Sequence, residues 1–108
     1  MSLTRALSLD ELGVNQPVRV ELGGVPICVV RDGAGEVHAI GDNCTHGDIS
    51  LADGFVEDDA VECWAHGSAF SLRTGIPKNL PAYEPVPVYL VKIDGDDVLI
   101  DPESTVAH

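Results

Sequence analysis

The sequence is poor in basic residues. Its 108 residues include 6 Lys and Arg against 18 Asp and Glu, which gives a net charge of −12. So few cations could not neutralise a phosphate backbone, and this argues against general nucleic-acid binding and against an anionic membrane surface. The acidic excess favours a monomer that repels its own copies and is steered toward a basic face on a partner.

Long apolar runs and paired cysteines are also missing. No run of 18 apolar residues occurs, so the sequence predicts no transmembrane helix. The first residues, MSLTRALSLDEL, carry two acidic side chains and no apolar signal-peptide segment, so we expect a cytoplasmic protein. Three cysteines in a reducing compartment do not indicate a disulfide framework.

What the sequence does contain indicates one small β-rich domain. Eleven Gly and seven Pro predict many turns and short elements, and a hydrophobic content of 44% suffices for one small core. Ser8 and Glu11 have the form of a capping box, which predicts one helical turn that ends at Gly13. Alternating or apolar runs bounded by turn residues predict strands at 17–22, 25–31, 36–40, 60–64, 69–73, 88–93 and 97–101.

These strands predict a particular organisation of the chain. Residues 1–40 are expected to form a β-meander, which together with residues 78–103 makes a β-sheet base. Residues 41–77 are expected to form a loop-rich insertion, followed by a proline-rich loop that holds its shape because proline fixes φ. The last six residues are expected to be frayed.

Two cysteine–histidine pairs stand out inside the insertion. Cys44-Thr-His46 and Cys63-Trp-Ala-His66 are separated by residues 47–62, and each pair is followed by glycine. Thiolates favour iron–sulfur clusters, zinc and copper(I), whereas imidazole suits iron, zinc and copper. A strand with buried Cys and His would need two coincidences. A structural zinc site is a stronger rival, although zinc fingers usually pair Cys with Cys and His with His.

The pattern C-T-H-G…C-x-x-H-G-S-x-F resembles the Rieske [2Fe–2S] signature. FSLRTG, the segment around Pro81, and PVPVYLVKIDGDDVLI are likewise similar to soluble Rieske ferredoxins of ring-hydroxylating dioxygenases. The resemblance implies an all-β Rieske fold, with an antiparallel β-sandwich base and an inserted cluster-binding subdomain. It implies one [2Fe–2S] cluster, with Cys44 and Cys63 on one iron and His46 and His66, partly exposed, on the other.

Residues around these ligands define the variant of the family. Gly47 and Gly67 let the backbone approach the cluster closely. Membrane-bound Rieske proteins of cytochrome bc complexes carry two more cysteines, which form a disulfide, at the positions of Ile49 and Ala65. Many of them also have a tyrosine, which bonds toward a cysteine sulfur, where this chain has Phe70. Losing that bond predicts a low reduction potential.

Two further positions bear on the site. Ser68 matches the serine of the high-potential type and would raise the potential somewhat if its hydroxyl reached a bridging sulfide. Trp64 stands where the family usually has proline. We expect it to pack against the base or the proline-rich loop rather than to form part of a docking surface beside the cluster.

The remaining polar candidates have simpler interpretations. Cys28 lies in the apolar run ICVV and is expected to be a core thiol, and His38 an ordinary strand histidine. Three aspartates of the insertion are expected in solvated loops, with guidance of a basic partner as the weaker alternative: Asp42, Asp48 and Asp53.

The resemblance implies a one-electron carrier. The sequence shows no nucleophile paired with a catalytic base and no sign of a substrate pocket. We therefore do not expect an enzyme in its own right. The family implies an NAD(P)H-dependent flavin reductase as donor and an oxygenase as acceptor. Alternatives are a Rieske protein of an iron–sulfur assembly system, the small subunit of a nitrite reductase, or a zinc-stabilised interaction module without a redox role.

Overall fold

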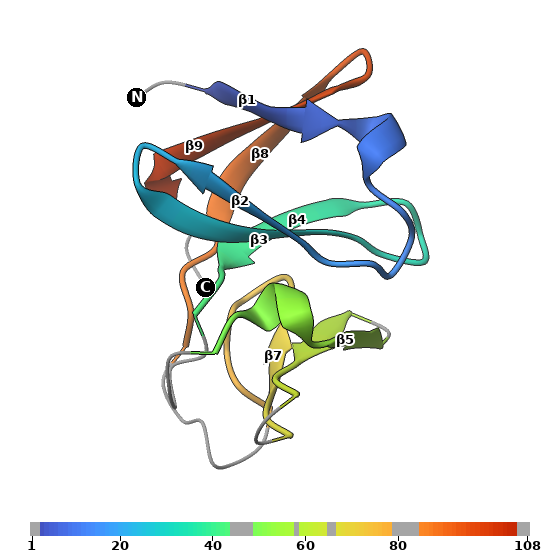
Figure 1. Ribbon diagram of the computed structural model, residues 1–108, viewed down its shortest axis with the longest axis vertical. Coiled ribbons are helices and arrows are strands. Elements are labelled where there is room, and N and C mark those ends of the chain that lie inside the picture. Colours follow the sequence, from blue (N-terminus) through green and yellow to red (C-terminus); the bar gives the residue numbers. More distant parts are fainter. Residues whose placement is uncertain (1–2, 44–48, 58, 65–66, 79–84, 106–108) are drawn as a thin grey trace.

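The computed structural model describes residues 3–43, 49–57, 59–64, 67–78 and 85–105. These residues form three antiparallel sheets of three strands each, with strand orders β1-β9-β8, β2-β3-β4 and β5-β6-β7 (Figure 1). In the described part of the chain, the helical segments are two short 3₁₀ turns. The elements are β1 (Thr4–Ser8), η1 (Leu9–Glu11), β2 (Val18–Leu22), β3 (Val25–Arg31), β4 (Val37–Gly41), η2 (Leu51–Asp53), β5 (Phe55–Glu57), β6 (Ala60–Glu62), β7 (Ala69–Ser71), β8 (Tyr89–Asp94) and β9 (Asp97–Thr105).

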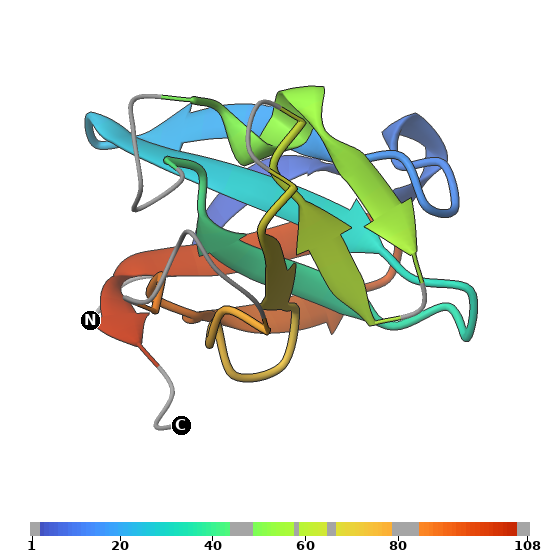
Figure 2. The ribbon, with the colours of Figure 1, turned by 90° about the horizontal axis from the view of Figure 1, so that it is seen from below.

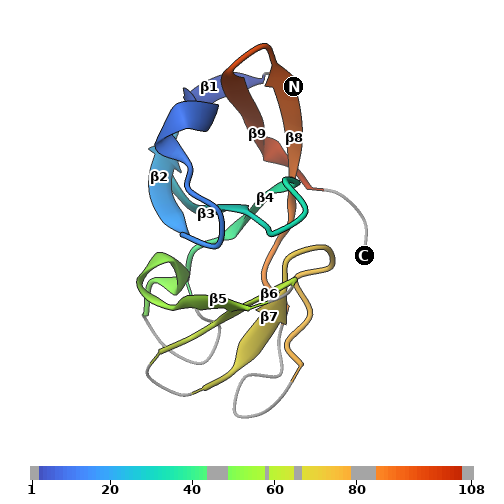
Figure 3. The ribbon, with the colours of Figure 1, turned by 90° about the vertical axis from the view of Figure 1, so that its right-hand side faces the viewer.

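The first two sheets pack against each other and form the upper part of the molecule. In Figure 3 they curve around a common interior, with β1, β9 and β8 on one side and β2, β3 and β4 on the other. Apolar side chains from both sheets fill this interior: Leu7, Leu12, Ile27, Val29, Ala39, Val98 and Ile100. Burial of this apolar surface supplies the main force that holds the two sheets together.

Strands β3 and β4 contribute to two cores at once. Along β3, Ile27 and Val29 face the upper core, whereas Cys28 and Val30 belong to a second buried cluster. Successive side chains of a strand point to opposite faces, so a strand covered on both faces reads as a continuous apolar run. This is why ICVV does not alternate with polar residues.

The small sheet β5-β6-β7 covers the second face of β3 and β4, as the view from below shows (Figure 2). Its inner side chains are Val56, Val61 and Phe70, which lie opposite one another across the three strands. The buried cluster between the layers contains Cys28, Val30, Ile40, Leu51, Val61, Cys63, Phe70, Leu72, Val86 and Val88. The small sheet is therefore anchored by its own apolar face.

The structure confirms the seven predicted strands to within a few residues and corrects the expectations at the two ends of the chain. The N-terminal segment is not only part of a meander, because β1 pairs with β9 at the other end of the sequence. The C-terminal segment is not frayed through 103–105, because β9 continues to Thr105. The helical turn is present as η1, although it ends at Glu11 rather than at Gly13.

Backbone hydrogen bonds tie the segments that flank the proline-rich stretch into place. Val86 N–H donates to the Gly75 carbonyl at 2.9 Å, and Gly41 N–H donates to the Pro87 carbonyl at 2.9 Å. The first of these bonds closes the chain back onto the turn after β7. The described part of the chain contains no helix with the length and apolar character that a membrane crossing requires.

Candidate metal centre

Cys63 lies directly after β6, at the start of a tight loop. Its N–H donates to the Ser68 carbonyl at 2.7 Å, and its own carbonyl accepts from Gly67 N–H at 2.9 Å. Gly67 has a φ of +73°, a left-handed conformation that glycine adopts without strain. These two backbone hydrogen bonds join the two ends of the loop. They fix the position of the Cys63 main chain, in addition to the packing of its side chain.

The Cys63 side chain is fully buried in the apolar cluster between the layers. Phe70 belongs to the same cluster and is also fully buried. Ser68, two residues before Phe70 in the sequence, is buried as well. A phenyl ring has no hydroxyl, so Phe70 contributes apolar packing and cannot donate a hydrogen bond to sulfur. Water is therefore excluded from the surroundings of the Cys63 side chain.

Three of the four predicted ligands, Cys44, His46 and His66, lie outside the described residues. The same holds for three other residues singled out from the sequence, Gly47, Asp48 and Ala65, and for residues 79–84 of the proline-rich loop, which include Pro81. The structure does describe what flanks the first pair, because Asn43 and Ser50 form an isolated antiparallel bridge. The residues before and after 44–48 are thus brought together.

Asp42 lies in a different environment from the one expected from the sequence. It was expected in a solvated loop, yet its side chain is fully buried and accepts three hydrogen bonds. Oδ2 accepts from Ser50 Oγ at 2.5 Å and from Arg19 Nε at 3.1 Å, and Oδ1 accepts from Ala52 N–H at 3.0 Å. Asp42 therefore fastens the base of the segment that holds the first Cys–His pair.

Trp64 and Asp53 face solvent. Trp64 keeps 54% of its surface exposed, which is more than the packing role expected from the sequence would leave. Asp53 is exposed, as expected for an aspartate in a solvated loop. Trp64 follows the buried Cys63 and lies in the turn after β6.

A second polar group lies at the β3–β4 turn. The His38 ring nitrogen Nε2 is 2.8 Å from Asp32 Oδ2, and both side chains are buried. Asp32 Oδ1 also accepts from the N–H groups of Ala34 and Glu36, each at 2.9 Å. The hydrogen bond with His38, followed by these backbone bonds, holds the pKa of Asp32 below its ordinary value against the effect of burial.

His38 is therefore more than the ordinary strand histidine that the sequence predicted. The signal that could have found its partner is Asp32 at the start of Asp-Gly-Ala-Gly, where an aspartate bonds to backbone N–H groups of its own turn. Cys28 is the core thiol that was expected, fully buried, and burial raises the pKa of its thiol. A buried cysteine in apolar surroundings is typically unreactive.

Comparison with known proteins decides the family. The family model described as "Rieske [2Fe-2S] domain" matches residues 3–90. The chain belongs to the Rieske [2Fe–2S] family. It is 44% identical over 106 residues to the ferredoxin component of biphenyl 2,3-dioxygenase from Rhodococcus jostii, with 98% of each chain covered.

Solved structures agree with the assignment of this Rieske protein. The ferredoxin of carbazole 1,9a-dioxygenase from Nocardioides aromaticivorans has a TM-score of 0.90 and 34% identity, and covers 95% of this chain and 100% of its own. A complex of reduced oxygenase and oxidised ferredoxin in carbazole 1,9a-dioxygenase matches with a TM-score of 0.88 and 30% identity, covering 96% of both chains. The all-β Rieske fold expected from the sequence is confirmed.

Family membership specifies the cofactor and the kind of protein. The chain binds a Rieske-type [2Fe–2S] cluster, and like its ferredoxin relatives it is an electron carrier rather than an enzyme in its own right. Cys63, the predicted ligand that the structure describes, fits this cofactor. Its thiol lies in an apolar, water-excluding cluster at the head of a loop with a left-handed glycine.

Proposed function

We propose that this Rieske ferredoxin passes single electrons from an NAD(P)H-dependent flavin reductase to a terminal oxygenase. The observation that carries the proposal is the likeness, over nearly the whole chain, to a dioxygenase ferredoxin component at 44% identity. The solved complex of an oxygenase with a ferredoxin of this fold supports an oxygenase as the acceptor. These likenesses favour that role over cluster assembly, nitrite reduction or a zinc module.

We further propose that four side chains hold the cluster: Cys44 and Cys63 on one iron, His46 and His66 on the other. When bound, the cluster supplies a centre that takes up and releases one electron. The chain's own residues keep that centre rigid and partly dry. Cys63 is fixed by its loop, Phe70 fills the space beneath, and Asp42 ties down the flanks of the first pair.

The cytoplasm is the compartment we propose, because a reductase that oxidises NAD(P)H draws on the cytoplasmic pool. We also propose a monomer. Two copies of the protein, each with a net charge of −12, repel one another in solution. A carrier that binds two partners in turn also needs a surface that is not covered by a second copy.

The ligand assignment is tested by replacing each candidate with alanine and measuring iron, acid-labile sulfide and the EPR spectrum. The wild-type protein should be red-brown and, once reduced, show the low average g value typical of a His₂Cys₂ cluster. Cys44→Ala, His46→Ala, Cys63→Ala and His66→Ala should each lose that signal. Cys28→Ala is the matched control, because Cys28 is equally buried but lies in β3 and should leave the cluster intact.

The opposite result is also informative. Iron and sulfide at wild-type levels in both cysteine variants would show that the cluster is held elsewhere. A wild-type protein that binds its cluster but transfers no electrons to any oxygenase would retain the ligand assignment and overturn the proposed acceptor.

A further inference from the structure

The small sheet has an outer face that points away from β3 and β4 and is largely open to solvent at Phe55, Glu57 and Glu62. Residues paired across the three strands point to the same side, so the strands present two rows that face away from the β3–β4 layer. This face is toward the viewer in Figure 2. We call these residues the outer face: Phe55, Glu62 and Ala69 in one row, and Glu57, Ala60 and Ser71 in the next.

The outer face is hollowed and carries an exposed aromatic ring. Phe55 keeps 63% of its surface in solvent, more than any other large hydrophobic side chain in the described part of the chain. It lines a hollow of about 450 Å³ together with Glu57, Ala60, Glu62, Ala69 and Lys78. An exposed aromatic side chain beside a concave surface with a polar rim is typical of a protein–protein contact.

The outer face adjoins the metal centre. Its first row, Phe55–Glu62–Ala69, is the one closest along the chain to the loop that begins at Cys63. Glu62 precedes Cys63 directly, and Ala69 follows Ser68, whose carbonyl accepts the Cys63 N–H. Trp64, 54% exposed, follows Cys63 on the other side. A protein that docked here would lie against the loop that holds the cluster.

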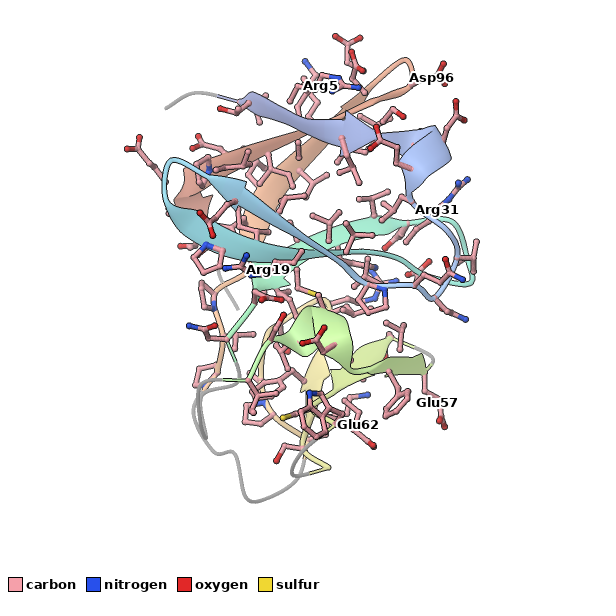
Figure 4. The ribbon with its side chains drawn as sticks, viewed as in Figure 1. Arg5, Arg19, Arg31, Glu57, Glu62 and Asp96 are labelled. Carbon is pink, nitrogen blue, oxygen red and sulfur yellow. The ribbon has the colours of Figure 1, made fainter. Side chains whose placement is uncertain are left out.

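The charge on this part of the surface is negative. Glu57 and Glu62 are exposed and labelled on the small sheet in Figure 4, whereas Arg5, Arg19 and Arg31 all lie on the two upper sheets. The nearby cations are already paired: Lys78 Nζ is 3.0 Å from Asp59 Oδ1, and Arg73 Nη1 is 2.8 Å from Glu36 Oε2. The outer face thus offers the exposed Phe55 with Glu57 and Glu62 beside it, and among the described residues neither glutamate forms an ion pair.

We propose that the outer face, with Trp64, is the docking surface for the oxygenase. The complementary surface has one apolar side chain that enters the hollow beside Phe55, and Lys or Arg side chains that approach Glu57 and Glu62. The apolar contact supplies most of the binding energy, and the charges steer the encounter. This inference rests on the proposed function, because it takes the oxygenase as the partner, and it adds which surface that partner contacts.

The test measures electron transfer from the reduced, cluster-loaded protein to the oxygenase of biphenyl 2,3-dioxygenase, with the ferredoxin concentration varied. Phe55→Ala should raise the KM for the ferredoxin about tenfold, with kcat within about twofold, because it removes binding without touching the cluster. Glu57→Gln should raise KM about threefold at low salt, and the difference should shrink as salt screens the charge. Visible and EPR spectra and the reduction potential should match the wild type in both.

Two variants on the far side of the molecule serve as controls. Ile93→Ala removes a side chain that is also exposed, at 42%, and Asp96→Asn removes an exposed acid at the opposite end in Figure 4. Both should retain wild-type KM. If Phe55→Ala and Glu57→Gln behave like these controls, the docking surface is wrong while the proposed function stands. If the wild type reduces no oxygenase, the proposed acceptor fails, and the docking assignment falls with it.

Discussion

Asp42 shows how much one side chain can contribute near the centre. A carboxylate removed from water is costly unless hydrogen bonds replace its hydration. Here the backbone carbonyl of Asp42 also accepts from Leu51 N–H, so main chain and side chain both bind the segment after residues 44–48. Arg19, which is half-exposed, supplies the opposite charge from β2. The residue thus links the upper sheets to the segment around the first Cys–His pair.

Replacing this carboxylate should destabilise the protein. We expect Asp42→Ala to lower the free energy of unfolding by about 2–3 kcal/mol, because three donors lose a charged acceptor and one of them, Ser50, is partly buried. Asp53→Ala removes an exposed acid from the neighbouring 3₁₀ turn and should change stability by less than about 0.5 kcal/mol. Urea denaturation of the cluster-loaded proteins measures both, and equal effects would contradict the role given to Asp42.

Phe70 offers a test of potential rather than of stability. Hydrogen bonds to the sulfurs of a Rieske centre stabilise the extra electron, and a phenyl ring provides none. We expect Phe70→Tyr to raise the midpoint potential, since the phenol adds a donor within the buried cluster that also contains Cys63. Protein-film voltammetry measures the shift, with iron content as the control. An unchanged or lower potential would show that the hydroxyl does not reach a sulfur.

At the scale of the elements, the joints between strands matter more than the strands. Gly75, in the turn after β7, lies against Val86, which follows the proline-rich stretch. The two segments can approach this closely because glycine has no side chain. A Cβ on Gly75 would lie 2.0 Å from the Val86 carbonyl oxygen, and the residue has a φ of +73°. The contact joins the small sheet to the strand that leads into β8, so it positions the small sheet against the base.

Gly75→Ala should therefore be clearly more harmful than a matched glycine replacement. Gly95, in the β8–β9 turn, has a φ of +63° but open space around a built Cβ. Gly95→Ala should lower stability by about 1–2 kcal/mol from backbone strain alone, and Gly75→Ala by more, because a carbonyl must also move. Thermal denaturation followed by circular dichroism compares the two. Equal losses of stability in the two variants would show that the Val86 carbonyl moves aside at no cost in free energy.

At the scale of the whole molecule, a series of polar contacts connects the base with the small sheet. Asp32 bonds His38 within the β3–β4 hairpin, and Glu36 of the same turn pairs with Arg73 from the turn after β7. The Glu36–Arg73 pair is about half-exposed on both sides and contributes little alone. The buried Asp32–His38 pair is the part of this link that should govern how stability responds to acid.

The pKa of Asp32 lies below its ordinary value in the folded protein, chiefly through the hydrogen bond with His38. The stability from this group is complete above the unfolded-state pKa of about 3.9 and is lost as the pH falls through that value toward the lower folded pKa. We expect Asp32→Asn to flatten this acid limb of the stability curve. Asp10→Asn, an exposed acid in η1, should leave it unchanged, and chemical denaturation between pH 3 and 7 compares them (roughly the window of carboxylate titration).

Local pattern determined much of this protein. The Cys–His spacing identified the family and the cofactor, and alternation or apolar runs located most strands, because these signals depend on residues near in sequence. The acidic composition indicated a protein that meets basic partners. Strands β1 and β5 were missed; β1 runs directly into the helical turn η1, and β5 follows η2 and has only three residues.

Only the tertiary structure decided which polar residues are buried and which apolar ones are not. The pairing of β1 with β9 joins the two ends of the chain, and Arg5 reaches Asp97 at 2.9 Å across a separation of 92 residues. Asp42 became a buried anchor because Ser50 and Arg19 converge on it. Phe55 remained exposed because the small sheet buries only its other face. Burial depends on what the rest of the chain brings close, and a residue's own neighbours in sequence do not specify it.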